Sequence, residues 1–186
     1  PSADAGVGSM PGDAKAMLVL RDNARRSDAI EREYRRAIRG AEREVLIANA
    51  YFFPGYGFLR DLRNAARRGV AVSLIFQGEP DTQIALTAAR TLYRHLVDAG
   101  VRIHEYCERP FHGKVALVDD DWSTVGSSNL DPLSLSLNLE ANVFIRDASF
   151  VRDLRERLHD LMELHCKAVD PASVPRRSFW QSLTRP

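Results

Sequence analysis

The sequence has little cysteine and little lysine. Its two cysteines, Cys107 and Cys166, lie far apart and form no C-x-x-C pattern, so we expect free, buried thiols in a reducing compartment and no disulfide or cysteine metal site. No other cluster of metal ligands is visible, and neither a metal nor a cofactor is predicted. Of the 26 basic residues, only Lys15, Lys114 and Lys167 are lysine. An ammonium group is therefore rare in this chain.

The sequence also lacks a charge excess and a long hydrophobic run. The formal net charge is +1, which argues against the strongly basic surface of a dedicated nucleic-acid binder. The longest uncharged stretch, residues 45–59, is 15 residues long and contains Asn49, Pro54 and two glycines. A membrane-spanning helix needs about 20 mostly apolar residues. Residues 1–15 have neither the basic start nor the apolar centre of a signal peptide and are predicted to be a linker.

What is present is an alternation of predicted strands and helices. A length of 186 residues with 45% hydrophobic residues fits one domain with its own core. The predicted strands cover residues 16–20, 45–50, 70–76, 101–106, 112–118, 123–126 and 140–145, and the predicted helices cover residues 27–40, 58–68, 82–98 and 150–165. Strands that alternate with helices favour parallel pairing, and the later strands follow one another directly. We predict a single α/β sandwich domain with a mixed sheet flanked by helices over residues 16–168, and a tail over residues 169–186.

One segment indicates a reaction. His112, Lys114 and Asp119 have the spacing H-x-K-x4-D. A neutral imidazole can attack phosphorus, an ammonium can hold the phosphate that is attacked, and a carboxylate can fix the local geometry. Because side chains alternate along a strand, His112 and Lys114 are expected to share one face. Lys114 precedes the apolar run 115–118, where an ammonium is costly unless an anion meets it.

A second group of polar residues follows the motif. Ser127, Asn129 and Glu140 provide a hydroxyl, an amide and a carboxylate. If the strands that carry the two groups are neighbours, their side chains converge at one end of the sheet, and Ser127 and Asn129 join Lys114 in binding a phosphate. Glu140 is expected to accept the second N–H of the His112 imidazole, which would fix its tautomer.

Each candidate has a plainer interpretation. A single strand histidine is usually a hydrogen-bonded structural residue, and Glu140 can be a surface carboxylate. Asp119 begins the run 119–121, an ordinary turn sequence, and is either a structural anchor or a group that touches substrate. The remaining histidines have no comparable neighbours and are interpreted as structural or solvent-facing; they are His95, His104, His159 and His165.

The two groups of residues together resemble the signature of the phospholipase D superfamily. Within it, the wider match is to bacterial cardiolipin synthases of the B type. The segments that carry this resemblance are 21–25, 47–56, 77–81 and 125–140. The resemblance implies a two-motif enzyme whose halves pack as a pseudo-dimer and share one cleft. This chain has one H-x-K-x4-D motif and is similar to the second half, so its partner would be an N-terminal half or a second copy of this chain.

The resemblance also implies a mechanism. One histidine attacks the phosphodiester to give a phosphohistidine, the other protonates the leaving alcohol, and an incoming alcohol reverses the roles. Phosphatidylglycerol would be both donor and acceptor, at the cytoplasmic face of the bacterial inner membrane, where the protein would be peripheral. The sequence leaves open which of the two roles belongs to His112. The isolated half is expected to have little or no activity.

Two other functions remain open at this stage. One is a single-motif phosphodiesterase or nuclease that completes its site by forming a homodimer, and the other is an inactive lipid-binding fragment. The balanced charge argues against a nucleic-acid groove. The aromatic segment 51–58 favours lipid contact, although its aromatic residues can also be core, as expected for Phe58. The cluster 176–180, which is basic and aromatic, also suits an anionic lipid interface.

Overall fold

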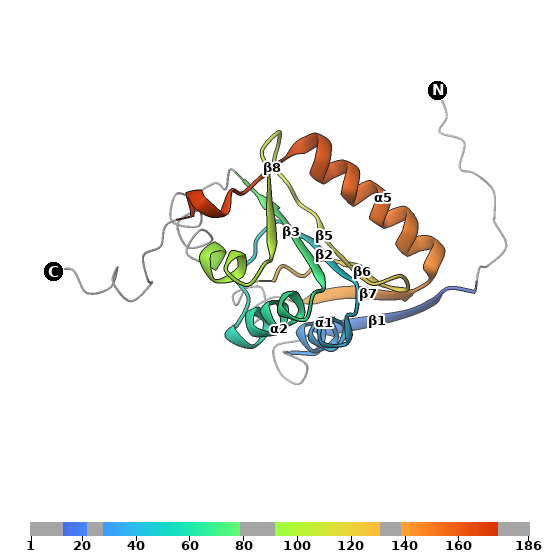
Figure 1. Cartoon of the computed structure of the whole chain (residues 1–186). Coiled ribbons are helices and arrows are strands. Elements are labelled where there is room, and N and C mark those ends of the chain that lie inside the picture. The colour runs from blue at the N-terminus through green and yellow to red at the C-terminus, as the bar shows by residue number, and fades with distance from the viewer. Residues whose placement is uncertain (1–12, 22–27, 79–91, 131–138, 175–186) are drawn as a thin grey trace, which may run out of the picture.

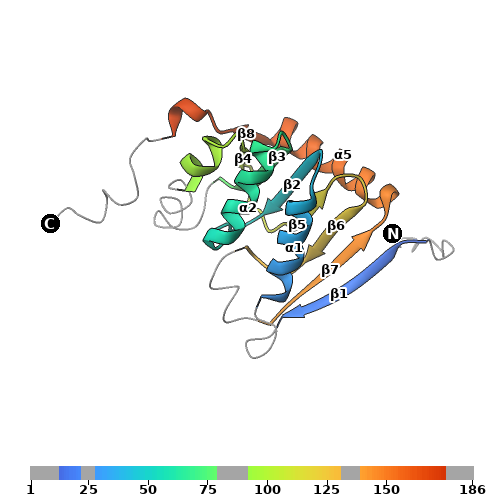
Figure 2. The same ribbon diagram turned by 60° about the horizontal axis from the view of Figure 1, so that its bottom comes forward.

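The computed structural model describes residues 13–21, 28–78, 92–130 and 139–174. This part of the chain forms one mixed sheet of eight strands between helices (Figures 1 and 2). The strands are β1 (Lys15–Arg21), β2 (Glu44–Asn49), β3 (Ala71–Gln77), β4 (Arg102–Tyr106), β5 (Lys114–Val118), β6 (Trp122–Gly126), β7 (Glu140–Arg146) and β8 (Cys166–Ala168). The helices are α1 (Ala29–Gly40), α2 (Tyr56–Arg67), α5 (Ala148–His165) and the 3-10 turn Pro171–Ser173. The predicted α/β sandwich is confirmed.

Helices cover both faces of the sheet, with α1 and α2 on one side and α5 on the other (Figure 1). Val45 and Ile47 of β2 pack in the core beneath α1 and α2, whereas Leu46 and Ala48 pack beneath α5. A strand buried on both faces must be apolar at successive positions, which is why residues 45–48 show no polar alternation.

The sheet contains both parallel and antiparallel strand pairs. Strands β2, β3 and β4 are parallel neighbours, as the alternation of strands and helices predicts. Strand β5 then pairs antiparallel with β2, and β6 and β7 continue antiparallel outward to β1. The full order is β1-β7-β6-β5-β2-β3-β4-β8. As a result, the end of β2, the start of β5, the end of β6 and the start of β7 meet at one end of the sheet.

Four details differ from the sequence prediction or extend it. Strand β5 begins at Lys114, so His112 precedes the strand and the alternation argument does not apply to it. Strand β8 was not predicted, because three residues carry too little periodicity to detect. Val174 is buried and Val169 packs against the same core, so the packed domain extends beyond residue 168. Of the predicted helix 82–98, residues 92–97 are helical and residues 82–91 lie outside the described part.

No helix in the described ranges combines the length and apolar character needed to cross a bilayer.

Candidate active site

The candidate residues gather at the sheet end where β2, β5, β6 and β7 meet. Lys114 is the register partner of Asn49 across the β2–β5 pair, and Gly126 is the partner of Asn142 across the β6–β7 pair. Directly paired residues of antiparallel strands point to the same face. The row therefore places Lys114 and two buried asparagines side by side on the face that α1 and α2 cover.

Lys114 is the charged centre of this row. Its side chain is buried, with 6% relative exposure, and its Nζ donates a hydrogen bond to the His112 carbonyl oxygen at 3.2 Å. Burial lowers the pKa of Lys114 below its ordinary value of 10.5, and the nearby negative charge of Glu140 opposes part of that shift. A buried ammonium with one carbonyl partner retains donors for an anion, as its apolar sequence context indicated.

His112 is exposed and lies two residues before β5. Its backbone is held on both sides: the carbonyl oxygen accepts from Lys114 Nζ, and the carbonyl of the following residue, Gly113, accepts from Ala50 N at 3.0 Å. A side chain at position 113 would collide with the ring of Phe111, so the close turn there requires glycine. The imidazole is thus open to a ligand while its backbone is fixed to the sheet.

Glu140 has a different partner from the one expected. Its carboxylate accepts from the Ser127 hydroxyl, and Ala141 N donates to the same hydroxyl oxygen at 3.1 Å. No hydrogen bond joins His112 to Glu140, both of which lie within the described residues. The expectation that Glu140 orients the imidazole is therefore corrected: in this structure it orients Ser127 and places negative charge near Lys114.

Asn129 lies on the segment that follows β6. Its side-chain oxygen is buried and has no hydrogen-bond partner among the described residues. An amide oxygen only accepts hydrogen bonds and cannot bind a phosphate oxygen, so a phosphate at Asn129 would be held by the Nδ2 donors, and Oδ1 would accept from a hydroxyl or a water molecule. Asn49 and Asn142, which the sequence interpretation did not include, both contact the backbone beside Asn129. The sequence signal for Asn49 is an amide at the end of the apolar run 45–48, and β7, which also carries Glu140 and Arg146, gives no such signal for Asn142.

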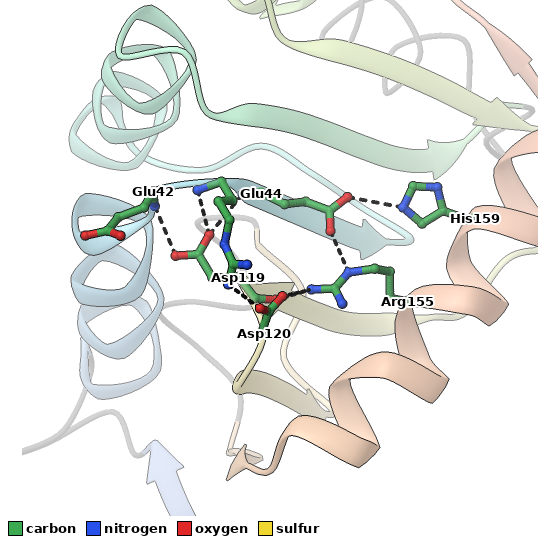
Figure 3. Close-up of polar contacts among 7 residues, drawn as sticks. Glu42, Glu44, Asp119, Asp120, Arg155 and His159 are labelled. Atoms are coloured by element: carbon green, nitrogen blue, oxygen red, sulfur yellow. Dashed lines mark hydrogen bonds and ion pairs between the residues drawn. The ribbon is translucent and has the colours of Figure 1, made fainter.

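Asp119 lies at the other end of β5 from Lys114 and does not join this row. Its carboxylate accepts from the backbone N–H of Glu42 at 3.0 Å, of Arg43 at 2.8 Å and of Glu44 at 2.9 Å (Figure 3). Its φ of +49° is the left-handed conformation that Asp and Asn tolerate best. These contacts are those of a structural anchor that fixes the start of β2, which is one of the two alternatives that the sequence left open for Asp119.

The anchor belongs to a polar network that ties α5 to the sheet. Arg155 donates from Nε to Glu44 at 2.8 Å and from its Nη2 to the Asp119 carbonyl oxygen, and His159 contacts the other Glu44 oxygen at 3.1 Å (Figure 3). His159 therefore has a structural partner. His165 contacts Glu108 in a similar way, at 2.8 Å.

We predict that Asp119→Asn destabilises the domain by about 1–2 kcal/mol at pH 7, because three charge-assisted backbone hydrogen bonds lose their charge. Burial alone would raise the pKa of Asp119, but the backbone donors of Glu44, Glu42 and Arg43 and the Arg43 charge together lower it below its ordinary value of 3.8. The carboxylate's contribution is thus present above the unfolded-state pKa and lost as pH falls through the folded-state pKa.

Thermal unfolding of the two proteins from pH 7 to pH 3 tests this prediction. The difference in Tm should be several degrees at pH 7 and should shrink toward acid pH. Asp120→Asn is the matched control, because its exposed carboxylate contacts only the side chains of Arg43 and Arg155. Equal small effects for both variants would argue against an anchor at Asp119.

Among the described residues, no group of three or more His, Cys, Asp or Glu side chains is arranged to hold a metal ion.

Comparison with known proteins identifies the family. The family model described as "Cardiolipin synthase, PLD-like domain" matches residues 34–162. The chain belongs to this family. The match contains His112, Lys114, Asp119, Asn129 and Glu140, and the resemblance drawn from those motifs is confirmed.

Individual members of the cardiolipin synthase family match over most of this chain. Cardiolipin synthase B of Escherichia coli (strain K12) is 58% identical over 175 residues, which are 94% of this chain and 42% of that protein. Cardiolipin synthase 2 of Bacillus anthracis is 33% identical over 154 residues, which are 81% of this chain and 30% of that protein. The chain thus spans less than half the length of these curated relatives.

Solved structures show the same fold. Nuc from Salmonella typhimurium, a phospholipase D family member, aligns with a TM-score of 0.69 at 20% identity, over 84% of this chain and 99% of that chain. Phosphatidylserine synthase from Haemophilus influenzae aligns with a TM-score of 0.72 at 13% identity, over 91% of this chain and 43% of that chain. The fold therefore makes up nearly the whole chain of Nuc but less than half of the chain of phosphatidylserine synthase.

Proposed function

We propose that this domain supplies one half of the active site of a phosphatidyltransferase that makes cardiolipin from two molecules of phosphatidylglycerol. The observation that carries the proposal is the buried ammonium of Lys114, which donates to the His112 carbonyl oxygen and is influenced by the negative charge of Glu140. A buried cation beside an exposed imidazole suits a substrate that brings a negative phosphate to a nucleophile or a proton donor. The 58% identity to cardiolipin synthase B supports the substrate class.

The proposed reaction has two steps. An imidazole nitrogen attacks phosphorus of the first phosphatidylglycerol, the bond from phosphorus to the glycerol headgroup oxygen breaks, and a second imidazole gives that oxygen a proton. A headgroup hydroxyl of the second phosphatidylglycerol then attacks phosphorus of the phosphohistidine, the phosphorus–nitrogen bond breaks and frees the first imidazole, and the hydroxyl proton returns to the second imidazole. The products are one cardiolipin and one glycerol. Lys114 and Asn129 bind the phosphate oxygens, and Ser127, held by Glu140, lines the same site.

This chemistry needs two imidazoles on opposite sides of phosphorus, whereas the chain has one H-x-K-x4-D motif. We infer that the second imidazole comes from another domain of the same family. The 42% coverage of cardiolipin synthase B agrees with a half of a larger enzyme. His112 is either the nucleophile or the proton donor in that complete site.

The test is an assay of the complete enzyme, in which this domain is joined to a second H-x-K-x4-D half, with phosphatidylglycerol vesicles. Cardiolipin and free glycerol should appear in equal amounts, and the isolated chain should form neither at a comparable rate. Phosphatidic acid in place of cardiolipin would indicate water as the acceptor and would contradict the transferase proposal.

A homodimeric phosphodiesterase is the second candidate, because Nuc shows that nearly an entire chain can consist of one copy of this fold. Two copies of the chain would then bring two His112 side chains together. Light scattering and hydrolysis of a chromogenic phosphodiester, measured on the same sample of the isolated chain, distinguish the two candidates. A stable dimer with substantial hydrolysis would favour the phosphodiesterase, and an inactive monomer would favour the half-domain.

A peripheral contact with the membrane is also part of the proposal. Tyr51, Phe53 and Tyr56 follow β2 at the site end of the sheet and are 40%, 42% and 74% exposed. Aromatic side chains of this kind favour the interface between lipid headgroups and acyl chains. Phe52, by contrast, is buried and stacks on Phe76 with ring centroids 4.7 Å apart, so it belongs to the core, the alternative that the sequence left open for this segment. The cluster 176–180 lies outside the described residues.

We predict that Phe53→Ser combined with Tyr56→Ser weakens pelleting with phosphatidylglycerol vesicles by roughly tenfold, because two exposed aromatic side chains lose their apolar contact with lipid. Folding should be unchanged, since neither side chain is part of the core. Phe150→Ser, which removes a similarly exposed aromatic residue from the start of α5, is the control. Equal binding by the double variant and the wild type would place the lipid-facing surface elsewhere.

A further inference from the structure

We propose that Asn49 and Asn142 are positioning residues that clamp the backbone on both sides of Asn129 and thereby aim its side chain at the substrate phosphate. The inference rests on the proposed function, which assigns Asn129 to that phosphate. Both asparagines are completely buried, at 0% exposure; Asn49 follows Val45 and Ile47 on one face of β2, and Asn142 precedes the buried Phe144 on one face of β7. Burying an amide is costly unless its donors and acceptors are paired, so each buried amide implies a specific partner.

The hydrogen-bond pattern fixes the orientation of the Asn142 amide. The Thr124 hydroxyl has one hydrogen, which it donates to the Val143 carbonyl at 3.0 Å, so toward Asn142 it can only accept. Asn142 therefore presents its Nδ2 to Thr124, at 3.1 Å, and turns its Oδ1 toward the backbone N–H of Ser128, at 3.4 Å. Because the Asn142 amide has one fixed orientation, its Oδ1 always faces the Ser128 N–H as an acceptor.

Asn49 holds the same segment from the other side. Its Oδ1 accepts from Leu130 N at 3.3 Å, and its Nδ2 approaches the Ser128 carbonyl oxygen at 3.5 Å. Asn49 is also the register partner of Lys114. The same residue therefore sets the segment that carries Asn129 relative to the strand that carries the ammonium.

The close approach also explains Gly126. A Cβ at this position would collide with the Asn142 side chain, so only glycine leaves room for the amide to lie against the end of β6. The two amides together engage the N–H and carbonyl of Ser128 and the N–H of Leu130. The backbone of Asn129 is thus held before and after the residue, which fixes the position from which its Nδ2 can donate to a phosphate oxygen.

Hydrogen exchange tests the clamp on the isolated chain, without any lipid substrate. Asn142→Leu should speed exchange of the Ser128 amide by at least about tenfold, and Asn49→Leu should do the same at Leu130, because each loses its acceptor. Ser73→Ala removes a buried hydroxyl in β3 and should change neither amide. Unchanged exchange at Ser128 and Leu130 in both leucine variants would overturn the proposal.

Kinetics of the complete enzyme test the positioning role. Asn142→Leu should lower kcat/KM by up to about 10²-fold, which is the loss expected when a group that binds substrate is misplaced by about 1 Å. If Asn142 acts through Asn129, the double variant Asn142→Leu with Asn129→Ala should be no worse than Asn129→Ala alone. Multiplying effects would show that Asn142 acts separately and would overturn the positioning role. A wild-type enzyme that makes no cardiolipin would refute the proposed function, whereas the exchange result would still decide the clamp.

Discussion

His112→Ala is expected to lower phosphatidyl transfer by the complete enzyme by at least about 10²–10⁴-fold, because the imidazole is required whether it is the nucleophile or the proton donor. The structure indicates that this substitution removes the imidazole without disturbing the fold. His112 is exposed, and what holds its position is its backbone carbonyl, which accepts from Lys114 Nζ at 3.2 Å. Alanine keeps that carbonyl, so the fold and the position of Lys114 should be unchanged.

Rates of cardiolipin formation and Tm values for wild type, His112→Ala and His95→Ala check this expectation. His95 is another exposed histidine, in the helical residues 92–97, and its loss should change neither quantity. Near-full activity in His112→Ala would remove this residue from the site. Brief reaction with phosphorus-labelled donor separates the two roles, since label becomes attached to the protein at His112 only if this imidazole is the nucleophile.

Lys114→Met is expected to lower the same rate by about 10²–10³-fold, as found when a single preorganised donor to a developing charge is lost. The same substitution should leave the free energy of unfolding unchanged or raise it. Lys114 is buried, and burial lowers its pKa below the ordinary value of 10.5, so folding works against its charge. Methionine has a similar volume and no charge, and replacing a buried ion by an apolar residue is often neutral or stabilising.

The pH dependence of stability gives an independent check on Lys114. Between its lowered folded-state pKa and its ordinary pKa, the unfolded chain binds the proton more strongly than the folded one. Stability therefore rises with pH across that window, and the rise should be smaller in Lys114→Met. Lys15→Met, on the exposed edge strand β1, is the control and should change neither rate nor stability. A large loss of Tm in Lys114→Met would show that the ammonium is a structural group.

His112 and Lys114 differ in how they affect the stability of the fold. The His112 imidazole is exposed, so its loss should lower activity and leave Tm unchanged. Lys114 is held in the apolar end of β5 at a cost to stability, and its activity and stability effects should run in opposite directions. A residue retained at a cost to folding is the pattern expected of a functional site.

The sequence by itself determined the elements and the family. Helix α1 follows from Ile30, Tyr34 and Ile38 at helical spacing, and all three are buried. The parallel strands follow from apolar runs that alternate with helices. The residue types of the H-x-K-x4-D motif led to the family, and their role at a phosphate stays a prediction. The helix, the strands and the motif can be found from sequence because each depends on residues close together in the chain.

Only the tertiary structure decided which side chains meet. The spacing grouped Asp119 with His112 and Lys114, yet β5 carries Lys114 and Asp119 to opposite ends of the sheet. Glu140 was assigned to the imidazole but bonds Ser127. Asn49 was noted only as a polar residue in the longest uncharged stretch, although its pairing with Lys114 places it in the candidate site. Strand register joins residues that are tens of positions apart, and no local periodicity encodes that register.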